Sequence, residues 1–255
     1  MIHPTAVVHA QAQIGAGCEI GPYCVIGKDV VLGPRCRLHS HVVIDGHTRL
    51  GEGNIIFPFA SIGLQTQDLK WQGGVTHTEI GDNNTFRECV TVHSATGDGE
   101  TTRVGSDNHI LAYAHVAHNV AIGNHVIMSN VATLAGHVIV EDYAVVGGVA
   151  AVHQFCRIGR MSMIGGCSKV VQDVVPFMIV DGNPGETRTV NKVGMERHGV
   201  PEEAQSALRQ AYKILFREGL TIPNALEQIE TKYPNVPEIK LLIDFVRASE
   251  RGITK

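Results

Sequence analysis

Residues 25–46 read VIGKDVVLGPRCRLHSHVVIDG, a stretch in which every sixth residue is aliphatic. The same spacing runs from Ile2 to Val170, and 26 of its 29 positions are apolar. The three exceptions are Asp68, Gly74 and Asp98. Self-similarity at a fixed period is typical of a solenoid, and a period of six fits neither an α-helix nor a single strand. Three such units would close a triangular coil that stacks at the spacing of neighbouring strands, about 4.8 Å. The pattern therefore predicts a parallel β-helix.

Two further regularities accompany the aliphatic residue. Gly often follows it directly, as at Gly27 and Gly33, and a small residue often precedes it by two, as at Cys24 and Cys36. We expect the Gly to supply the backbone freedom that a sharp corner needs. We expect the small residue to fit a narrow core, where a free thiol behaves as a small apolar group.

The composition narrows the class of protein. Hydrophobic residues make up 44% of the 255-residue chain and aromatic residues only 5%, as expected of a thin aliphatic core. A net charge of −4 gives no bias toward nucleic acid. The N-terminal MIHPTAVVHAQAQIG enters the repeat at once, and no apolar run is long enough to span a membrane. Because the cysteines occupy inward positions, we expect a reducing compartment. The sequence predicts a cytoplasmic protein with no integral membrane segment and no nucleic-acid partner.

The hexapeptide pattern predicts two domains. A β-helical domain over residues 1–189 carries two loops, near 64–78 and 94–102, where the period breaks. The segment 173–186 contains several Gly and Pro residues and is expected to be a turn-rich exit. A helical domain follows over residues 190–255, because helix start and stop signals bracket PEEAQSALRQAYKILFREG, TIPNALEQIETKY and PEIKLLIDFVRASERG.

Histidines gather in one part of the repeat. Residues 18 apart stack on successive coils, so His118, Gly136 and Gln154 are expected in one column, flanked by His137 and His153. Such a column suits acyl transfer, with His as general base and a Gly N–H stabilising an oxyanion. A zinc site between subunits is an alternative, since His is the commonest metal ligand. Exposed histidines of turns can also be merely solvated.

Four phrases make the chain resemble a known family: FASIGLQTQDLK at 59–70, VGSDNHILAYAHVAHN at 104–119, ATLAGHV at 132–138 and AVHQFCRIG at 151–159. They resemble UDP-N-acetylglucosamine O-acyltransferases over essentially the whole chain. The resemblance implies a left-handed β-helix and a homotrimer that needs no metal or organic cofactor. The implied reaction moves an (R)-3-hydroxyacyl chain from acyl carrier protein to the 3-hydroxyl of UDP-N-acetylglucosamine, the first step of lipid A synthesis.

The resemblance also implies roles for particular residues. It makes His118 the general base and Gly136 the oxyanion donor, with His153 and Gln154 as further catalytic residues. The implied acyl-chain ruler is Gly166, at the floor of the acyl groove. The implied substrate-binding residues are Asp68, Lys70, His115, His137, Asn191 and Arg197.

The chain departs from the family pattern at four places. Asn119 follows the implied base where the family has Asp, Val193 and His198 replace a Glu and an Arg, and Ser94-Ala95 replaces Arg-Gly. A neutral Asn keeps open an alternative in which the acceptor carries a 3-amino group. Three other readings stay open: a coenzyme A-dependent acyltransferase, a trimeric zinc hydratase of the carbonic-anhydrase type, and a non-catalytic scaffold.

Overall fold

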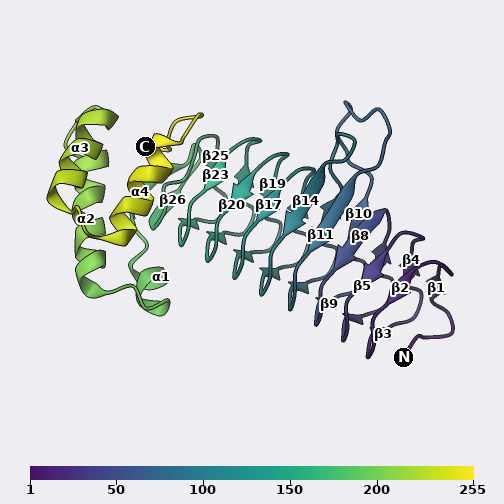
Figure 1. Ribbon diagram of the computed structural model, residues 1–255. Coiled ribbons are helices and arrows are strands. Elements are labelled where there is room, and N and C mark those ends of the chain that lie inside the picture. The colour runs from purple at the N-terminus through teal and green to yellow at the C-terminus, as the bar shows by residue number, and fades with distance from the viewer.

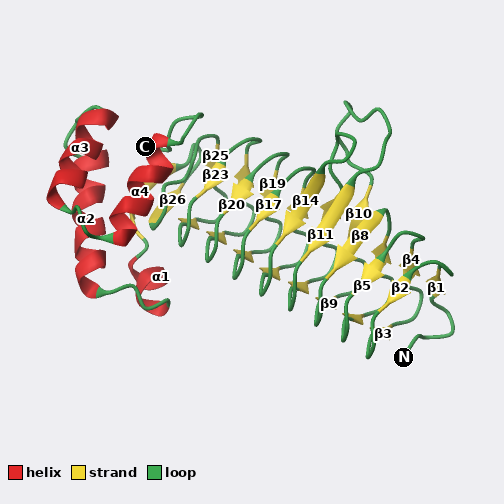
Figure 2. Cartoon of the chain, viewed as in Figure 1, coloured by secondary structure: helices red, strands yellow, loops and turns green.

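The computed structural model, which describes residues 1–255, is an elongated stack of three-sided coils with helices packed at one end (Figure 1). Nearly all strands of the stack are short, and a turn separates each from the next (Figure 2). The predicted fold class, a parallel β-helix with a small C-terminal helical part, is confirmed. No helix combines the length and apolar composition that crossing a membrane requires.

Three sheets form the sides of the coils, and their strands are parallel except for β27 at the end of the third sheet. The first sheet contains β1 Val7–Val8, β4 Val25–Ile26, β7 Val43–Ile44, β10 Ser61–Leu64, β13 Thr91–His93, β16 His115–Val116, β19 Thr133–Leu134, β22 Ala151–Val152 and β25 Lys169–Val170. The second contains β2 Gln13–Ile14, β5 Val31–Leu32, β8 His47–Leu50, β11 His77–Ile80, β14 Thr101–Val104, β17 Ala121–Ile122, β20 Ile139–Val140 and β23 Arg157–Ile158. The third contains β3 Glu19–Ile20, β6 Arg37–Leu38, β9 Ile55–Ile56, β12 Thr85–Phe86, β15 His109–Ile110, β18 Ile127–Met128, β21 Val145–Val146, β24 Met163–Ile164, β26 Met178–Asp181 and β27 Glu186–Val190.

The pairing register shows where extra residues enter the stack. Most partners are 18 residues apart, as in Thr133↔Ala151. Ser61 pairs with Thr91 and Thr91 pairs with His115, which are wider separations. The two polar stretches between β10 and β11 and between β13 and β14 therefore form loops on the side of the stack, near β10 and β14 in Figure 1.

The coils turn at three corners. Following the chain, the first corner lies between the first and second sheets, the second corner between the second and third, and the third corner between the third and first. Each corner uses a non-glycine residue in the left-handed backbone region: Asn119 and His137 at the first, Tyr143 at the second, and Val131 and Val149 at the third.

The predicted reason for the glycine pattern is therefore wrong. Gly21 and nearly all of its equivalents have ordinary φ, and most left-handed residues fall elsewhere in the turns; Gly63, with φ of 79°, is an exception. A Cβ on Gly21 would lie 2.8 Å from the carbonyl carbon of His39 on the next coil. Gly is needed because neighbouring coils approach too closely for a side chain, rather than because the corner needs a special backbone conformation.

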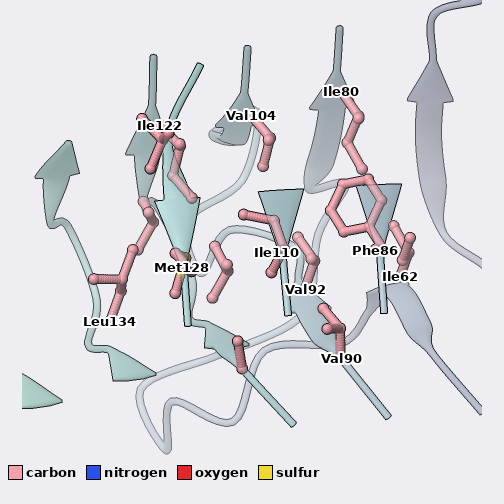
Figure 3. Packing of buried hydrophobic residues seen from close by; sticks show 14 of the residues in the cluster. Ile62, Ile80, Phe86, Val90, Val92, Val104, Ile110, Ile122, Met128 and Leu134 are labelled. Atoms are coloured by element: carbon pink, nitrogen blue, oxygen red, sulfur yellow. The ribbon is translucent and has the colours of Figure 1, made fainter. Parts of the chain in front are cut away.

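The aliphatic residues of all three sheets meet along the axis of the stack. Ile62, Phe86, Ile110 and Met128 are completely buried there, and Figure 3 shows them packed side by side with their neighbours. The cysteines Cys18, Cys24, Cys36 and Cys156 are buried and free, as their inward positions predict. Burial raises the pKa of Cys36 and Cys156 to about 11, so these thiols remain protonated and unreactive.

The end of the stack differs in part from the expectation. The segment expected to be a turn-rich exit contains an antiparallel hairpin, β26 with β27, whose turn holds Gly182 and Gly185. A short helix, α1 Lys192–Arg197, follows and was not expected, because six residues are too few to show a helical period. The three expected helices are present as α2 Glu202–Phe216, α3 Ile222–Lys232 and α4 Pro237–Arg247. They bury Leu208, Leu226 and Leu242 in a second apolar cluster.

Candidate active site

The first corner brings His118 and Gly136 into contact. His118 lies in the turn between β16 and β17, and Gly136 lies above it on the next coil. A Cβ on Gly136 would collide with Cε1 and Nε2 of the His118 ring, so the imidazole lies directly against the Gly136 backbone. The Gly136 N–H forms no hydrogen bond within the chain. This geometry matches the column that the 18-residue stacking predicts.

The two nitrogens of His118 have different surroundings. Nδ1 lies 2.9 Å from Oδ1 of Asn119. Because an amide oxygen can only accept, Nδ1 is the protonated nitrogen when the imidazole is neutral, and Nε2 then holds the free electron pair. Nε2 makes no hydrogen bond and lies 3.6 Å from Oδ2 of Asp68. The His118 side chain is 13% exposed, so it is sheltered but accessible to a substrate.

Asn119 holds His118 in this tautomer because its own amide is fixed. The backbone N–H of Thr96 donates to Oδ1 of Asn119 at 3.1 Å, and Nδ2 of Asn119 donates to Oε2 of Glu100 at 2.7 Å. A flipped amide would lose both bonds. The orientation of the base therefore depends on the loop between β13 and β14, to which Thr96 and Glu100 belong.

Three more histidines surround the base. His137 stands edge-on to His118 with ring centroids 5.2 Å apart, and its other face stacks on Phe155. His115 has Nδ1 2.7 Å from the Thr91 hydroxyl, and the buried His93 is edge-on to His115. Burial is the largest cause that lowers the pKa of His115 and His137, and it lowers the pKa of His93 to about 4. These three imidazoles are therefore neutral at neutral pH and act as hydrogen-bonding groups.

His93 and Glu100 were not selected from the sequence. Both belong to the region where inserted residues displace the register, since Thr91 pairs with His115 across 24 residues instead of 18. Stacking arithmetic with a constant period fails across that insertion. The usable signal is the polar interruption of the repeat itself, because it marks where the register changes.

The loop between β10 and β11 reaches the same corner. Its Asp68 faces His118, and the Asp68 backbone is held by Thr66, whose hydroxyl lies 3.1 Å from that of Thr96 in the other loop. Lys70 N–H donates to Oδ1 of Asp68 at 3.0 Å, while the Lys70 side chain is exposed. The two loops thus contact each other beside the base.

His153 and Gln154 lie further along the first corner and are exposed. Nδ1 of His153 is 3.1 Å from the Gln154 carbonyl oxygen and 3.4 Å from Nη2 of Arg251. They share the face of the prism that carries His118 and Gly136, without a direct contact to His118. Their predicted catalytic roles stay predictions.

The remaining predicted residues lie elsewhere on the chain. Asn191 is buried, and its amide caps α1 through Gly194 N–H and donates to the Met161 carbonyl. This structural role occupies the Asn191 side chain, which was expected to contact a nucleotide. Arg197, at the end of α1, is exposed. Its neighbour His198 packs on Tyr143 of the second corner, so Arg197 is not beside His118 in the same chain.

Gly166 lies near the third corner. A Cβ there would meet only the Gly148 carbonyl oxygen, at 3.3 Å, and the backbone φ of Gly166 is negative. Neither packing within the chain nor backbone conformation requires glycine at this exposed position. Gly166 therefore leaves surface space that a larger residue would fill, and its role at an acyl groove stays a prediction.

No three His, Cys, Asp or Glu side chains of one chain are grouped as metal ligands. The first corner instead joins an oriented imidazole, a free Nε2 and an adjacent glycine backbone, which is an arrangement for general-base catalysis on a solenoid scaffold. Fold and corner together define the class of hexapeptide-repeat acyltransferases.

Comparisons with known proteins identify the family. Residues 173–254 match the family model described as UDP-N-acetylglucosamine O-acyltransferase, domain 2, and residues 11–46 match the bacterial transferase hexapeptide model of six repeats. The chain is 44% identical to LpxA from Acinetobacter baumannii, covering 100% of this chain and 99% of that one, with a TM-score of 0.96. It is 39% identical to LpxA, a UDP-N-acetylglucosamine acyltransferase from Bacteroides fragilis, with 100% of both chains covered and a TM-score of 0.98. The enzyme from Francisella novicida is 38% identical, with 100% and 94% covered and a TM-score of 0.96.

The chain belongs to the UDP-N-acetylglucosamine O-acyltransferase family, so the predicted resemblance is confirmed. Its coils accordingly form the left-handed β-helix of that family.

Proposed function

We propose that the protein transfers an (R)-3-hydroxyacyl chain from acyl carrier protein to the 3-hydroxyl of UDP-N-acetylglucosamine, the first step of lipid A biosynthesis. The observation that carries this proposal is the first corner, where Asn119 fixes His118 with a free Nε2 against Gly136. Family membership supplies the substrate class, and the geometry supplies the base.

The reaction requires one proton to move through His118. Nε2 accepts the proton of the sugar hydroxyl as its oxygen attacks the thioester carbonyl. The Gly136 N–H, which has no acceptor within the chain, donates to the developing oxyanion. When the carbon–sulfur bond breaks, the imidazolium returns the proton to the departing thiolate. Product ester, free thiol and neutral His118 then complete the cycle.

The residues around the base suit an uncharged sugar edge. His115 and His137 are neutral because burial lowers their pKa, so they can exchange hydrogen bonds with hydroxyl groups. Asp68 lies at the Nε2 side of the base, where it can accept from a sugar hydroxyl or amide. We propose that Lys70, exposed on the same loop, binds a phosphate.

The site needs a second copy of the chain. An apolar patch with exposed Ile127 and Met163 lies on the third sheet, and exposed Val149 lies at the third corner. The first corner, which carries His118, is opposite the third sheet in the same prism. An apolar acyl chain can contact both features at once only if two prisms stand side by side, as cyclic symmetry allows. We therefore propose a homotrimer with sites between adjacent chains, where Arg197 of one chain approaches the nucleotide held by another.

We propose that exposed lysines receive the acyl donor. Lys169 and Lys213 are exposed without an ion-pair partner, whereas Arg157 and Arg160 are paired with Glu141 and Asp142. The two free lysines are therefore the stronger candidates for an acidic carrier protein. The cytoplasmic location expected from the sequence stays a prediction.

A mass-spectrometric transfer assay tests the reaction. It combines (R)-3-hydroxyacyl carrier proteins of several chain lengths with UDP-N-acetylglucosamine, and His118→Ala is the control. We expect an acylated sugar nucleotide from the natural chain and almost none from the variant. Failure to form product with any chain length would overturn the proposal. In the same assay, Gly166→Met is expected to shift the preferred chain to shorter lengths.

Asn119 supports a second acceptor. A neutral amide stabilises an imidazolium less than a carboxylate would, and an amine nucleophile can attack before it loses a proton. The analogue of the sugar nucleotide with a 3-amino group should therefore be offered in parallel. A higher kcat/KM with the amine would assign amide formation to this protein, and a higher value with the alcohol would assign ester formation.

A further inference from the structure

The loop between β13 and β14 places a carboxylate one side chain away from the base. Oε2 of Glu100 accepts from Nδ2 of Asn119 at 2.7 Å, and Oδ1 of Asn119 lies 2.9 Å from Nδ1 of His118. The three side chains form a continuous line of hydrogen bonds from the exposed loop to the imidazole. Asn119 by itself contributes no charge to this line.

The carboxylate is held in place independently of the base. The Gly97 N–H donates to the same Oε2 of Glu100 at 2.8 Å, which anchors the carboxylate to its own loop. Hydrogen bonds from Asn119 and then from Gly97 lower the pKa of Glu100, so it is ionised at neutral pH. On the other side, the backbone N–H of Asn119 donates to the Thr102 hydroxyl at 2.8 Å, which fixes the relay residue.

We propose that Glu100 is a positioning residue that acts through Asn119 on His118: it locks the amide so that Nδ1 of His118 donates, and it supplies the negative charge that stabilises the imidazolium. This inference rests on the proposed function of His118 as general base and deepens it. An amide polarised by a carboxylate is a better acceptor than a free amide, because hydrogen bonds in a chain strengthen one another.

Other charged or titratable groups also face His118 and must be kept constant. They are Asp68 and Lys70 from the loop between β10 and β11, His93 on β13, His115 on β16 and His137 in the turn after β19. All of them are retained in every variant below. A difference between variants therefore reports on Glu100 and Asn119 alone.

The test compares three variants with the natural chain: Glu100→Gln, Asn119→Asp and the double variant. Glu100→Gln removes the charge with little change of shape, and we expect kcat/KM to fall roughly tenfold and its acidic limb to move to lower pH. Asn119→Asp alone places two carboxylates in hydrogen-bond contact, where they repel each other, so it should also be impaired. The double variant moves the single carboxylate next to His118 and should recover to within about threefold of the natural chain.

The control is Glu79→Gln. Glu79 lies on β11 in an exposed ion pair with Arg103, with 3.1 Å between Arg103 Nε and Glu79 Oε2, so its loss removes the same charge away from the base. We expect it to leave both kcat/KM and the pH profile unchanged. The proposal is wrong if Glu100→Gln keeps the kcat/KM and pH profile of the natural chain, as Glu79→Gln should. It is also wrong if Glu100→Gln loses activity while the acidic limb of the pH profile stays in place. A double variant no more active than Glu100→Gln would overturn the relay as well.

A second measurement does not depend on turnover. Deuterium exchange at the imidazole C2 position, followed by mass spectrometry from about pH 5 to 9, gives a titration midpoint for each histidine. For His118, we expect a lower midpoint in Glu100→Gln than in the natural chain, and an equal midpoint would contradict the proposal. If the natural chain forms no product, the proposed function fails, and this midpoint still decides whether the relay exists.

Discussion

Two corners of the same coils carry polar side chains with different roles: those of the second corner stabilise the stack, and those of the first corner form the candidate site. Inside the second corner, Asn54, Asn84 and Asn108 form a ladder of completely buried amides. On the outside of the first corner, His118 is 13% exposed and leaves Nε2 without a hydrogen bond. Both sets occupy turns of the same hexapeptide repeat. They differ in hydrogen bonding: the side-chain polar atoms of the asparagines all have partners within the chain, whereas Nε2 of His118 has none.

The ladder leaves no polar atom without a partner. Nδ2 of Asn84 donates to Oδ1 of Asn54 and to the Gly105 carbonyl, and Oδ1 of Asn84 accepts from the backbone and side chain of Asn108. The ladder ends at Val126, whose N–H donates to Oδ1 of Asn108 at 2.7 Å. A buried polar network that is fully bonded fixes the stacking of coils. The first corner has the opposite property, since its free Nε2 is what a substrate can use.

The comparison predicts the largest effect at His118. His118→Ala removes the base while every ladder bond remains, so we expect kcat/KM to fall by about 10³-fold or more and the melting temperature to stay nearly constant. Steady-state kinetics and thermal unfolding of the same preparation measure both. A variant that keeps more than a tenth of the activity would remove His118 from the mechanism.

Asn84→Ala in the ladder should have the reverse effect, a loss of stability without a loss of activity. It leaves the Gly105 carbonyl and two Asn108 donors without partners, so we expect the free energy of unfolding to fall by about 3 kcal/mol. The activity of the folded fraction should be unchanged, because the ladder does not touch the first corner. Chemical denaturation at fixed protein concentration gives the stability. A loss of activity without a loss of stability would break the distinction between the two corners.

Gly136→Ala tests how closely the base is fitted. The added Cβ would collide with the His118 ring, which must then move from the position set by Asn119. We expect kcat/KM to fall by roughly 10²-fold, because misplacing a catalytic group by about 1 Å has that effect. Gly27→Ala is the matched control, since a Cβ there would collide with the Asp45 side chain, on coils far from the base. Equal losses in both variants would contradict the proposed contact.

The smallest expected effect is a pH dependence of stability caused by the buried His93. Its pKa is about 4 in the folded chain and about 6.5 when unfolded, so the unfolded chain binds more protons between these values. Stability is therefore complete above about pH 6.5 and falls as the pH drops toward 4, by on the order of 2 kcal/mol at pH 5. The lowered pKa of His115 and His137 acts in the same direction. Denaturation at several pH values should show a smaller slope in His93→Gln, and an unchanged slope would assign the effect to other groups.

Periodic features of the sequence predicted the structure best. The six-residue spacing predicts the parallel β-helix, and the 18-residue stacking predicts the contact between His118 and Gly136. The interpretation of the glycines was wrong, because a repeat shows where Gly occurs but not which constraint selects it. The hairpin of β26 and β27 and the short helix α1 were missed, since neither is long enough to show a period.

Stacking arithmetic places site residues only where the register is constant. Glu100 and His93 lie in the region of inserted residues, and the positions of their side chains follow from how the two loops fold over the corner. The resemblance implies a nucleotide contact for Asn191, which stays a prediction, while the structure shows its amide bonded to α1 and to the Met161 carbonyl. Hydrogen bonds of this kind depend on the local backbone conformation, which the sequence pattern does not predict.

The sequence by itself determined the class of fold, the inward aliphatic core and the family, because each depends on a pattern repeated many times along the chain. The tertiary structure alone decided the tautomer of His118, its tie to Glu100 through Asn119, and the separation of His118 from the apolar third sheet. These depend on single contacts between residues distant in sequence. The scaffold follows from a pattern that many units share, so exceptions in single units do not change it. A catalytic site depends instead on the few positions at which the units differ.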